Sequence, residues 1–389
     1  MLKNKKIAVF LGDWFWSSVP YDGIPLYNLL SMHFQTDLIM FDADARLNKT
    51  HFGPNEKYNF DASVFRNIAN LRIVKDWSEL FASSAEYDLI ITSSHIAPKT
   101  RYPTSFNMTK KVSGLTKCPI AIWDIGGADL LTNGSIFADY FFVKGLIWKE
   151  WLVKMGFKEN KVFVTGSPHY DNFLEDFEPY MIEKILSKEE FDKKYDLKNN
   201  EKILLMPTNP GSHKEQFEES MNSLSEIVDS CAEKNIDLLV KTYPHDYIFY
   251  QKEMPYSGIY KRKYTSVPQY EYIRNKYPTV KVVESQDHFA AIKHVNKIFN
   301  MAGSHVAWET YFTDSVSYST NYKKQKYYKN LSYLPDYVKF PDEHMNIHVE
   351  SSKKIIEDNS ELKKDLCADY FLNKISIFEI LDSVKKILG

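Results

Sequence analysis

Short apolar runs that alternate with helix-like stretches constrain the fold more than any other feature of this sequence. Runs such as KIAVFLG at 6–12, PIAIWD at 119–124 and KIFNMAG at 297–303 have the length of buried strands. Strands that alternate with helices in this way form parallel βαβ units, since each crossover helix covers one face of the sheet. The pattern therefore predicts an α/β protein.

The alternation stops once, in a charged segment at 172–200, and then starts again. A chain of 389 residues also exceeds what one core usually covers, at about 150 residues per domain. We therefore expect two Rossmann-like domains. Their predicted boundaries are 1–175 for an N-terminal domain, 176–200 for linker helices, 201–365 for a C-terminal domain, and 366–389 for a helix that packs on either domain. The expected strands lie at 6–12, 37–41, 71–75, 87–94, 119–124, 140–145 and 161–166, and then at 201–209, 237–244, 280–285, 297–303 and 314–319.

Composition excludes several classes of protein. Apolar residues make up 44% and charged residues 26%, as in ordinary globular proteins, and the net charge of −2 argues against a nucleic-acid-binding surface. The three cysteines lie far apart without metal-ligand spacing, which indicates a reducing compartment. No apolar stretch approaches the roughly 18 residues that cross a bilayer. We expect a cytoplasmic protein, at most peripheral to the inner face of the membrane.

The segment at 298–319 indicates a nucleotide-linked ligand. An expected strand runs into the turn Gly303-Ser304-His305, which opens a helix that carries Glu309. The start of a helix offers unpaired N–H groups and a positive dipole end to a phosphate. A carboxylate in the following turn can accept hydrogen bonds from the vicinal hydroxyls of a ribose. The alternative is that Glu309 only caps or solvates the helix.

Other polar residues also follow expected strands, and ligands of open α/β sheets bind beyond the carboxyl ends of the strands. The expected site is therefore a central cleft that both domains face. Asp124 is the first candidate for a general base, because the glycines after it let an acceptor approach closely. Its alternative role is to cap a helix, and Asp13 and His95 are the reserves.

Three further residues at strand ends have two interpretations each. Thr208 contacts a phosphate of the donor or simply ends a strand. His245 neutralises a donor phosphate or bonds a loop carbonyl, and Lys241 is structural unless it points into the cleft. In the segment GSPHYD, Gly166 and Asp171 are expected to be scaffold, with Asp171 capping the next helix.

The ordered pieces VFVTGSPHYDNF, ILLMPTNPG, KTYPHD and AGSHVAWET resemble GT-B glycosyltransferases of bacterial surface-polysaccharide synthesis, between residues 120 and 320. The most similar members are capsule Kdo-transferase-like and CDP-glycerol glycerophosphotransferase-like proteins. The chain departs from them at Pro244-His245, where the family has His-Pro. The resemblance implies a metal-independent transferase of capsule polysaccharide biosynthesis, without a cofactor. Its donor would be nucleotide-linked, of the CMP or CDP type, and its acceptor a glycan or lipid-linked glycan.

Two other functions stay open. A non-hydrolysing nucleotide-sugar 2-epimerase uses the same two domains without an acceptor, and a noncatalytic assembly partner would bind a nucleotide or glycan without turnover. The pair Asp42 and Asp44 matches the metal clamp of the other common glycosyltransferase fold, but that fold leaves the second α/β half unexplained. No metal site is expected. The motifs GxxxxGK[ST], GxGxxG and GxSxG are absent from the sequence, which disfavours P-loop, dinucleotide-binding and α/β-hydrolase enzymes.

Overall fold

The chain forms two compact units, each with its own parallel sheet. Unit 1 comprises Met1–Lys184 and Ala368–Gly389, and unit 2 comprises Ile185–Cys367. The computed structural model describes residues 2–12, 18–41, 68–75, 77–93, 116–123, 138–154, 156–182, 184–207, 214–241, 267–284, 287–301, 306–320, 347–360, 371–372 and 374–389.

Unit 1 has, in its described residues, a seven-stranded sheet in the order β3-β2-β1-β4-β5-β6-β7, and every pairing is parallel. Six of these strands follow the 3-2-1-4-5-6 order of Rossmann folds, which reverses between β1 and β4. The strands are β1 (Lys6–Gly12), β2 (Gln35–Phe41), β3 (Leu71–Val74), β4 (Leu89–Ser93), β5 (Ile120–Trp123), β6 (Tyr140–Val143) and β7 (Val162–Val164). All seven expected strands of the first half are present. Their ends differ from the expected ones by at most two residues.

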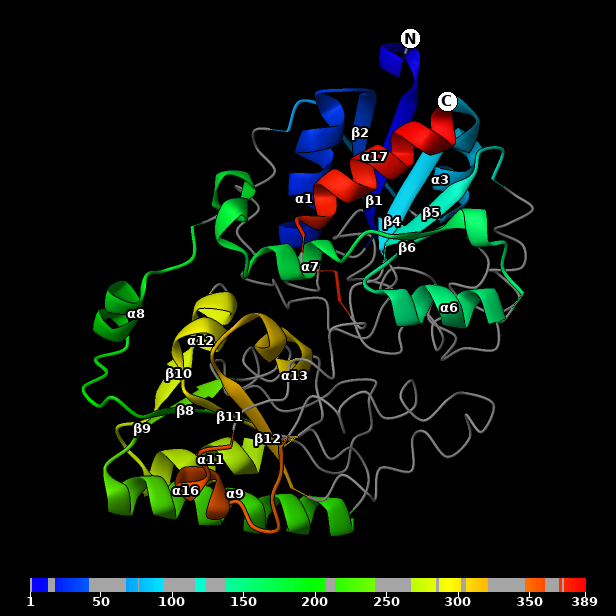
Figure 1. Ribbon diagram of the computed structural model, residues 1–389. Coiled ribbons are helices and arrows are strands. Elements are labelled where there is room, and N and C mark those ends of the chain that lie inside the picture. The colour runs from blue at the N-terminus through cyan, green and yellow to red at the C-terminus, as the bar shows by residue number, and fades with distance from the viewer. Residues whose placement is uncertain are drawn as a thin grey trace. The chain divides into compact units, whose positions relative to one another are not determined.

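Helices in the segments between the strands cover this sheet. They are α1 (Ser18–Ser31), α3 (Trp77–Ser83), α6 (Leu146–Lys154), α7 (Pro168–Asp171) and α17 (Ser376–Leu388), with 3-10 turns η1 (Leu2–Asn4), η3 (Ser84–Glu86), η5 (Glu159–Lys161) and η6 (Glu175–Tyr180). The C-terminal helix α17, red in Figure 1, packs on α1 and α7. It buries Ile377, Ile380 and Val384 completely in the same core as β1. Each such side chain contributes about 1.5–3 kcal/mol, so α17 is an integral part of unit 1.

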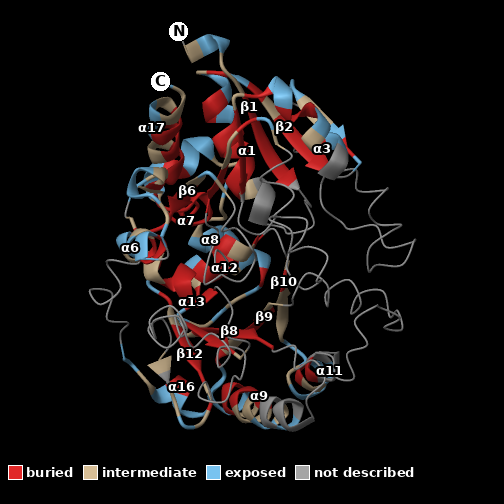
Figure 2. Cartoon of the chain, turned by 90° about the vertical axis from the view of Figure 1, so that its right-hand side faces the viewer, coloured by how far each residue is buried: buried red, intermediate tan, exposed pale blue. Residues whose placement is uncertain are grey.

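Unit 2 has a six-stranded sheet in its described residues, again all parallel, in the order β10-β9-β8-β11-β12-β13. This is the full 3-2-1-4-5-6 order, and it reverses between β8 and β11. The strands are β8 (Lys202–Met206), β9 (Asp237–Lys241), β10 (Lys281–Val283), β11 (Lys297–Asn300), β12 (Val316–Ser319) and β13 (Ile347–His348). The central strands β8 and β11 are buried along their whole length, as Figure 2 shows for β8. The two-residue strand β13 was not expected, because it is too short to produce a pattern.

The helices of unit 2 are α8 (Lys188–Lys194), α9 (Lys214–Lys234), α11 (Val267–Lys276), α12 (His288–His294), α13 (Val306–Glu309) and α16 (Lys354–Glu357), with the 3-10 turn η8 (Thr310–Phe312). Helix α8 starts with a capping box, in which Ser187 and Glu190 bond each other's backbone N–H. The helix is tied to β8 because the carboxylate of its Asp192 accepts hydrogen bonds from the ammonium group of Lys202, a buried residue of that strand. The charged segment at 172–200 thus contributes η6 to unit 1 and α8 to unit 2.

The predicted α/β class and the two parallel-sheet Rossmann-like domains are confirmed. Among the helices of the described residues, none combines the length and the hydrophobicity that spanning a bilayer requires.

Candidate active site

The carboxyl ends of three strands of unit 2 bring together a carboxylate, an imidazole and an ammonium group. Glu309 ends α13, which follows β11. His288 is the first residue of α12, which follows β10, and Lys241 is the last residue of β9. Because the sheet reverses its order between β8 and β11, this edge is where Rossmann folds bind their ligands.

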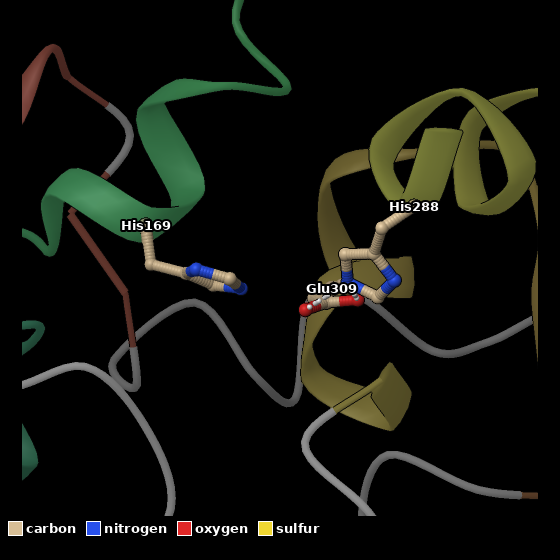
Figure 3. Close-up of side chains that lie close together, drawn as sticks. All are labelled: His169, His288 and Glu309. Carbon is tan, nitrogen blue, oxygen red and sulfur yellow. Dashed lines mark hydrogen bonds and ion pairs between the residues drawn. The ribbon is translucent and has the colours of Figure 1, made fainter. Parts of the chain in front are cut away.

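Glu309 is buried, with 2% of its surface exposed, and it is paired with His288. The Nε2 atom of the imidazole lies 2.9 Å from each of the two carboxylate oxygens (Figure 3). A buried carboxylate is costly unless it is hydrogen-bonded, and this imidazole supplies a hydrogen-bonding partner. The orientation of Glu309 is therefore fixed within unit 2 itself.

Lys241 is the nearby positive charge. It is half-buried at the end of β9, and burial lowers its pKa, while the carboxylate of Glu309 acts to raise it. An ammonium group that already lacks part of its water shell gains more from an anionic ligand than a fully hydrated one. The edge of this sheet thus offers a carboxylate to hydroxyl groups and a cation to phosphate.

A second set of contacts fixes the start of α12 and with it His288. The hydroxyl of Tyr195 donates to Asp287 at 2.5 Å and accepts from the backbone N–H of Glu284 at 3.0 Å. Lys194 forms ion pairs with Asp287 at 2.6 Å and with Glu284 at 2.8 Å. Burial and Asp287 raise the pKa of Tyr195, so the phenol stays protonated and keeps donating. Lys194, the last residue of α8, and Tyr195, which follows it, thus hold Glu284, which follows β10, and Asp287, which precedes His288.

In unit 1 the segment Thr165–Asn172 anchors the C-terminal helix. The carboxylate of Asp171 accepts from the backbone N–H of Ser376 at 2.8 Å and of Ile377 at 3.1 Å. Gly166 has φ of +80°, and a Cβ atom there would lie 2.4 Å from Ser376 Oγ. The expectation that Asp171 caps the next helix is wrong, because its carboxylate caps α17. The residues around Asp171 in the sequence give no sign of this contact. Its role as scaffold holds.

The same segment carries a buried pair of titratable groups. His169 of α7 and Asp22 of α1 are 5% and 0% exposed, and His169 Nδ1 lies 3.4 Å from Asp22 Oδ1. The sequence predicted no role for either residue. His169 stands in the polar segment GSPHYD, which was a usable signal, whereas Asp22 has no sequence signal of its own within α1.

Of the candidate catalytic and ligand-binding residues predicted from the sequence, only Glu309 and Lys241 belong to the described part of the chain, and the charge of Glu309 acts on Lys241. The remaining candidates lie outside the described residues, and their roles stay predictions: Asp13, His95, Asp124, Thr208, His245, Gly303, Ser304 and His305. The pair Asp42 and Asp44 also lies outside them.

Comparison with known proteins places the fold. No protein-family model matches the chain, and no curated protein matches it in sequence. Solved structures match over nearly its whole length. The S. aureus MnaA–UDP co-structure is 13% identical over 99% of this chain and 97% of that chain, with a TM-score of 0.61. The UDP-GlcNAc 2-epimerase from Neisseria meningitidis bound to UDP-GlcNAc is 14% identical over 98% and 100%, with a TM-score of 0.54.

A third solved structure is a polymerase by name. The wall teichoic acid polymerase TagF is 13% identical over 99% of this chain and 90% of that chain, with a TM-score of 0.51. At these identities the likeness establishes the fold alone. The chain has the GT-B fold, with two Rossmann-like parallel-sheet domains, as the sequence resemblance implied.

Proposed function

We propose that the protein is a GT-B enzyme that binds a nucleotide-activated sugar or polyol in unit 2 and transfers that group to a bacterial surface glycan. The observation that carries the proposal is the buried carboxylate of Glu309 at the point where the sheet of unit 2 reverses its order. A Rossmann-type sheet binds nucleotides at this edge. A fixed carboxylate there is suited to the two hydroxyls of a ribose.

The neighbours of Glu309 suit the rest of a nucleotide. Lys241 supplies positive charge for a phosphate, and His288 fixes the carboxylate that receives the ribose. The sequence adds the turn Gly303-Ser304-His305 before α13 as a donor of N–H groups, with Thr208 and His245 as further phosphate contacts. Such preorganised donors and cations stabilise the negative charge that grows on the leaving phosphate.

Transfer also needs an acceptor and a base. The sequence resemblance favours a glycan or lipid-linked glycan as acceptor, which would keep the protein in the cytoplasm or at the inner face of the membrane. Asp124 remains the base suggested by sequence. The resemblance also favours a cytidine-linked donor and a reaction that needs no metal ion.

The second candidate function is a non-hydrolysing 2-epimerase acting on a nucleotide sugar. The observation that favours it is the fold likeness to MnaA, whose structure holds UDP, and to a 2-epimerase bound to UDP-GlcNAc. Both TM-scores exceed that of TagF. The two functions share the nucleotide site proposed in unit 2 and differ in whether an acceptor is consumed.

Thermal unfolding with CMP, CDP, UDP, GDP and ADP tests the shared site. A nucleotide at 100 times its Kd stabilises the folded protein by about 2.7 kcal/mol, so a true ligand gives a clear rise in Tm. We expect one nucleoside base to be preferred and Glu309→Gln to lose most of the rise. The matched control is Glu357→Ala, which removes a carboxylate of unit 2 with a 73% exposed side chain. No rise with any nucleotide, or an equal rise in Glu309→Gln, contradicts the proposal.

Incubation of the matching nucleotide sugar without acceptor separates the two functions. An epimerase converts the donor alone to a second nucleotide sugar, whereas a transferase leaves it essentially unchanged until an acceptor glycan is added. The proposed reaction runs equally well in EDTA. Accumulation of an epimer in the acceptor-free sample would replace the transferase by the second candidate.

A further inference from the structure

A buried imidazole and a buried carboxylate meet at the carboxyl edge of the sheet of unit 1. Gly23, next to Asp22 in α1, lies against Leu11 and Trp123, which stand at the carboxyl ends of β1 and β5. This contact places Asp22 at the edge of the sheet where α/β folds bind their ligands. The sheet of unit 1 reverses its order between β1 and β4, so Asp22 is also at the switch point.

His169 reaches this position from far along the sheet. It belongs to α7, which follows β7, the strand at the opposite edge from β3. After β7 the chain returns toward α1, and α7 packs on α1 (Figure 1). The return path is fixed by Gly166 and Asp171, which both contact α17. The fold therefore holds His169 beside Asp22 by contacts that do not involve the imidazole.

Two side chains other than that of His169 help to hold α7 in place. Asp171 ties this helix to α17, and the side-chain amide of Asn172 bonds the carbonyls of Pro168 and His169, at 3.4 and 3.1 Å. Burying two titratable groups is costly, and replacing such a pair by apolar residues often leaves stability unchanged or improves it. Buried pairs of titratable groups occur often at functional sites, so this acid–imidazole pair is a candidate for chemistry.

We propose that His169, oriented by Asp22, is the proton acceptor of unit 1 in the transfer reaction, an inference that rests on the proposed function. A carboxylate at Nδ1 favours the tautomer with the proton on that nitrogen, which leaves the lone pair on Nε2. It also stabilises the imidazolium that forms. The 3.4 Å separation is long for a hydrogen bond, as catalytic contacts often are before substrate binds.

The proton balance of the step is simple. The hydroxyl oxygen of the acceptor forms a bond to the transferred group while its proton moves to Nε2 of His169. The bond between that group and the nucleotide phosphate breaks, and its electron pair leaves on the phosphate. The imidazolium, paired with Asp22, then releases the proton to water before the next turnover.

The decisive variant is His169→Asn. Its side-chain N–H can take the place of Nδ1–H beside Asp22, so a purely structural role survives the change, whereas the basic Nε2 is lost. We expect kcat to fall about 10²–10⁴-fold, with the KM for the donor and the Tm little changed. The rise of rate with pH that reports the free base should disappear. Asp22→Asn is expected to lower kcat less, because it misorients the base without removing it. His33→Asn, in the turn after α1, is the matched histidine control.

The outcomes separate this inference from the function on which it rests. A His169→Asn enzyme that keeps its kcat within about threefold of the wild type overturns the role of His169 and leaves the transferase intact. Asp124→Asn is tested in parallel, and loss of activity in that variant alone assigns the base to Asp124 instead. Nucleotide-induced stabilisation through Glu309 is measured for every variant. Wild-type protein that neither binds a nucleotide nor turns over overturns both proposals.

Discussion

The carboxylate of Asp171 accepts a hydrogen bond from the backbone N–H of Ser376 at 2.8 Å, across 205 positions of the sequence. Its other oxygen accepts from the N–H of Ile377. The first N–H groups of a helix have no partner within the helix, and an anion there also complements the helix dipole. A short helix in the middle of the chain thus caps the helix near its carboxyl end.

Replacing Asp171 by alanine is expected to destabilise unit 1. Two buried N–H groups lose their acceptor, which costs about 1–3 kcal/mol each before relaxation, so we expect a loss of at least about 2 kcal/mol in the free energy of unfolding. Urea denaturation followed by circular dichroism measures it. The control Asp176→Ala changes an exposed carboxylate of η6 and should stay within about 0.5 kcal/mol of the wild type. Similar losses in the two variants would contradict the capping role.

Comparing Gly166→Ala with Gly156→Ala separates two destabilising effects of a Cβ atom in unit 1, backbone strain at a positive φ and a steric clash. Its φ of +80° disfavours any residue with a Cβ atom, and that atom would lie 2.4 Å from Ser376 Oγ. Gly156 has φ of +97°, but a Cβ atom there would have no atom within 4 Å. Gly156→Ala therefore costs only the backbone strain. We expect about 1 kcal/mol for Gly156→Ala and clearly more for Gly166→Ala. Adding Ser376→Ala should recover part of the difference, and equal costs at the two glycines would contradict the contact.

The stability of unit 1 should fall as the pH rises toward neutrality. Burial raises the pKa of Asp171 to about 7, although the N–H groups of α17 act to lower it. In the unfolded chain an aspartate titrates near pH ~4. Between these values the folded unit holds a proton that the unfolded chain has lost, so the free energy of unfolding decreases with pH by up to about 1.4 kcal/mol per unit.

The measurement is a series of urea denaturations between about pH 4 and pH 7 for the wild type and Asp171→Asn. The asparagine does not titrate, so its series should lack the part of the slope that comes from this residue. Identical slopes for the two proteins would show that Asp171 titrates alike in the folded and unfolded states.

The contact between Glu309 and a ribose can be tested with the ligand as well as with the protein. A nucleotide that lacks both ribose hydroxyls should bind the wild type about 10–100-fold more weakly than the normal nucleotide, as expected for hydrogen bonds to a charged group. In Glu309→Gln the same comparison should give a much smaller factor, because the carboxylate is gone. Isothermal titration calorimetry gives the four Kd values, and an unchanged factor in the variant would place the ribose elsewhere.

Lys241 is expected to strengthen the binding of the phosphate groups of a nucleotide and not of its nucleoside. Lys241→Met keeps much of the apolar stem and removes the charge. The affinity for the nucleoside diphosphate is expected to drop about tenfold or more, with the affinity for the uncharged nucleoside nearly unchanged. Lys276→Met, at a 56% exposed side chain of α11, is the matched control. Equal weakening of both ligands would mean that Lys241 supports the structure of the site instead of contacting phosphate.

The strands could be predicted from sequence because each is a short apolar run bounded by polar residues. The twelve expected strands are all present, and β13 is the only strand of the described residues that was missed. The helix expected within 366–389 is also present, as α17, since an amphipathic pattern persists over several turns. The sheet orders were not predicted, because strand pairing depends on contacts between residues far apart in the sequence.

The candidate site was predictable only in part, for the same reason. Glu309 stood out because it follows an apolar strand and a small polar turn. His288 has no sequence pattern that marks it as a site residue. It was not predicted because its role comes from a contact with Glu309 that only the fold creates. Asp22 and His169 are separated by most of unit 1, so no local pattern links them. Asp171 was judged from its own neighbourhood, while its partner lies in α17.

Because α17 completes the core around β1, the order of synthesis matters for this protein. Unit 2 is one continuous stretch and can fold as soon as it leaves the ribosome, whereas unit 1 must wait for residues 376–388. During that interval the apolar surface that α17 will cover is exposed to aggregation and to chaperones. A stop codon before Ser376 is therefore expected to prevent unit 1, which is synthesised first, from folding, while unit 2 still folds.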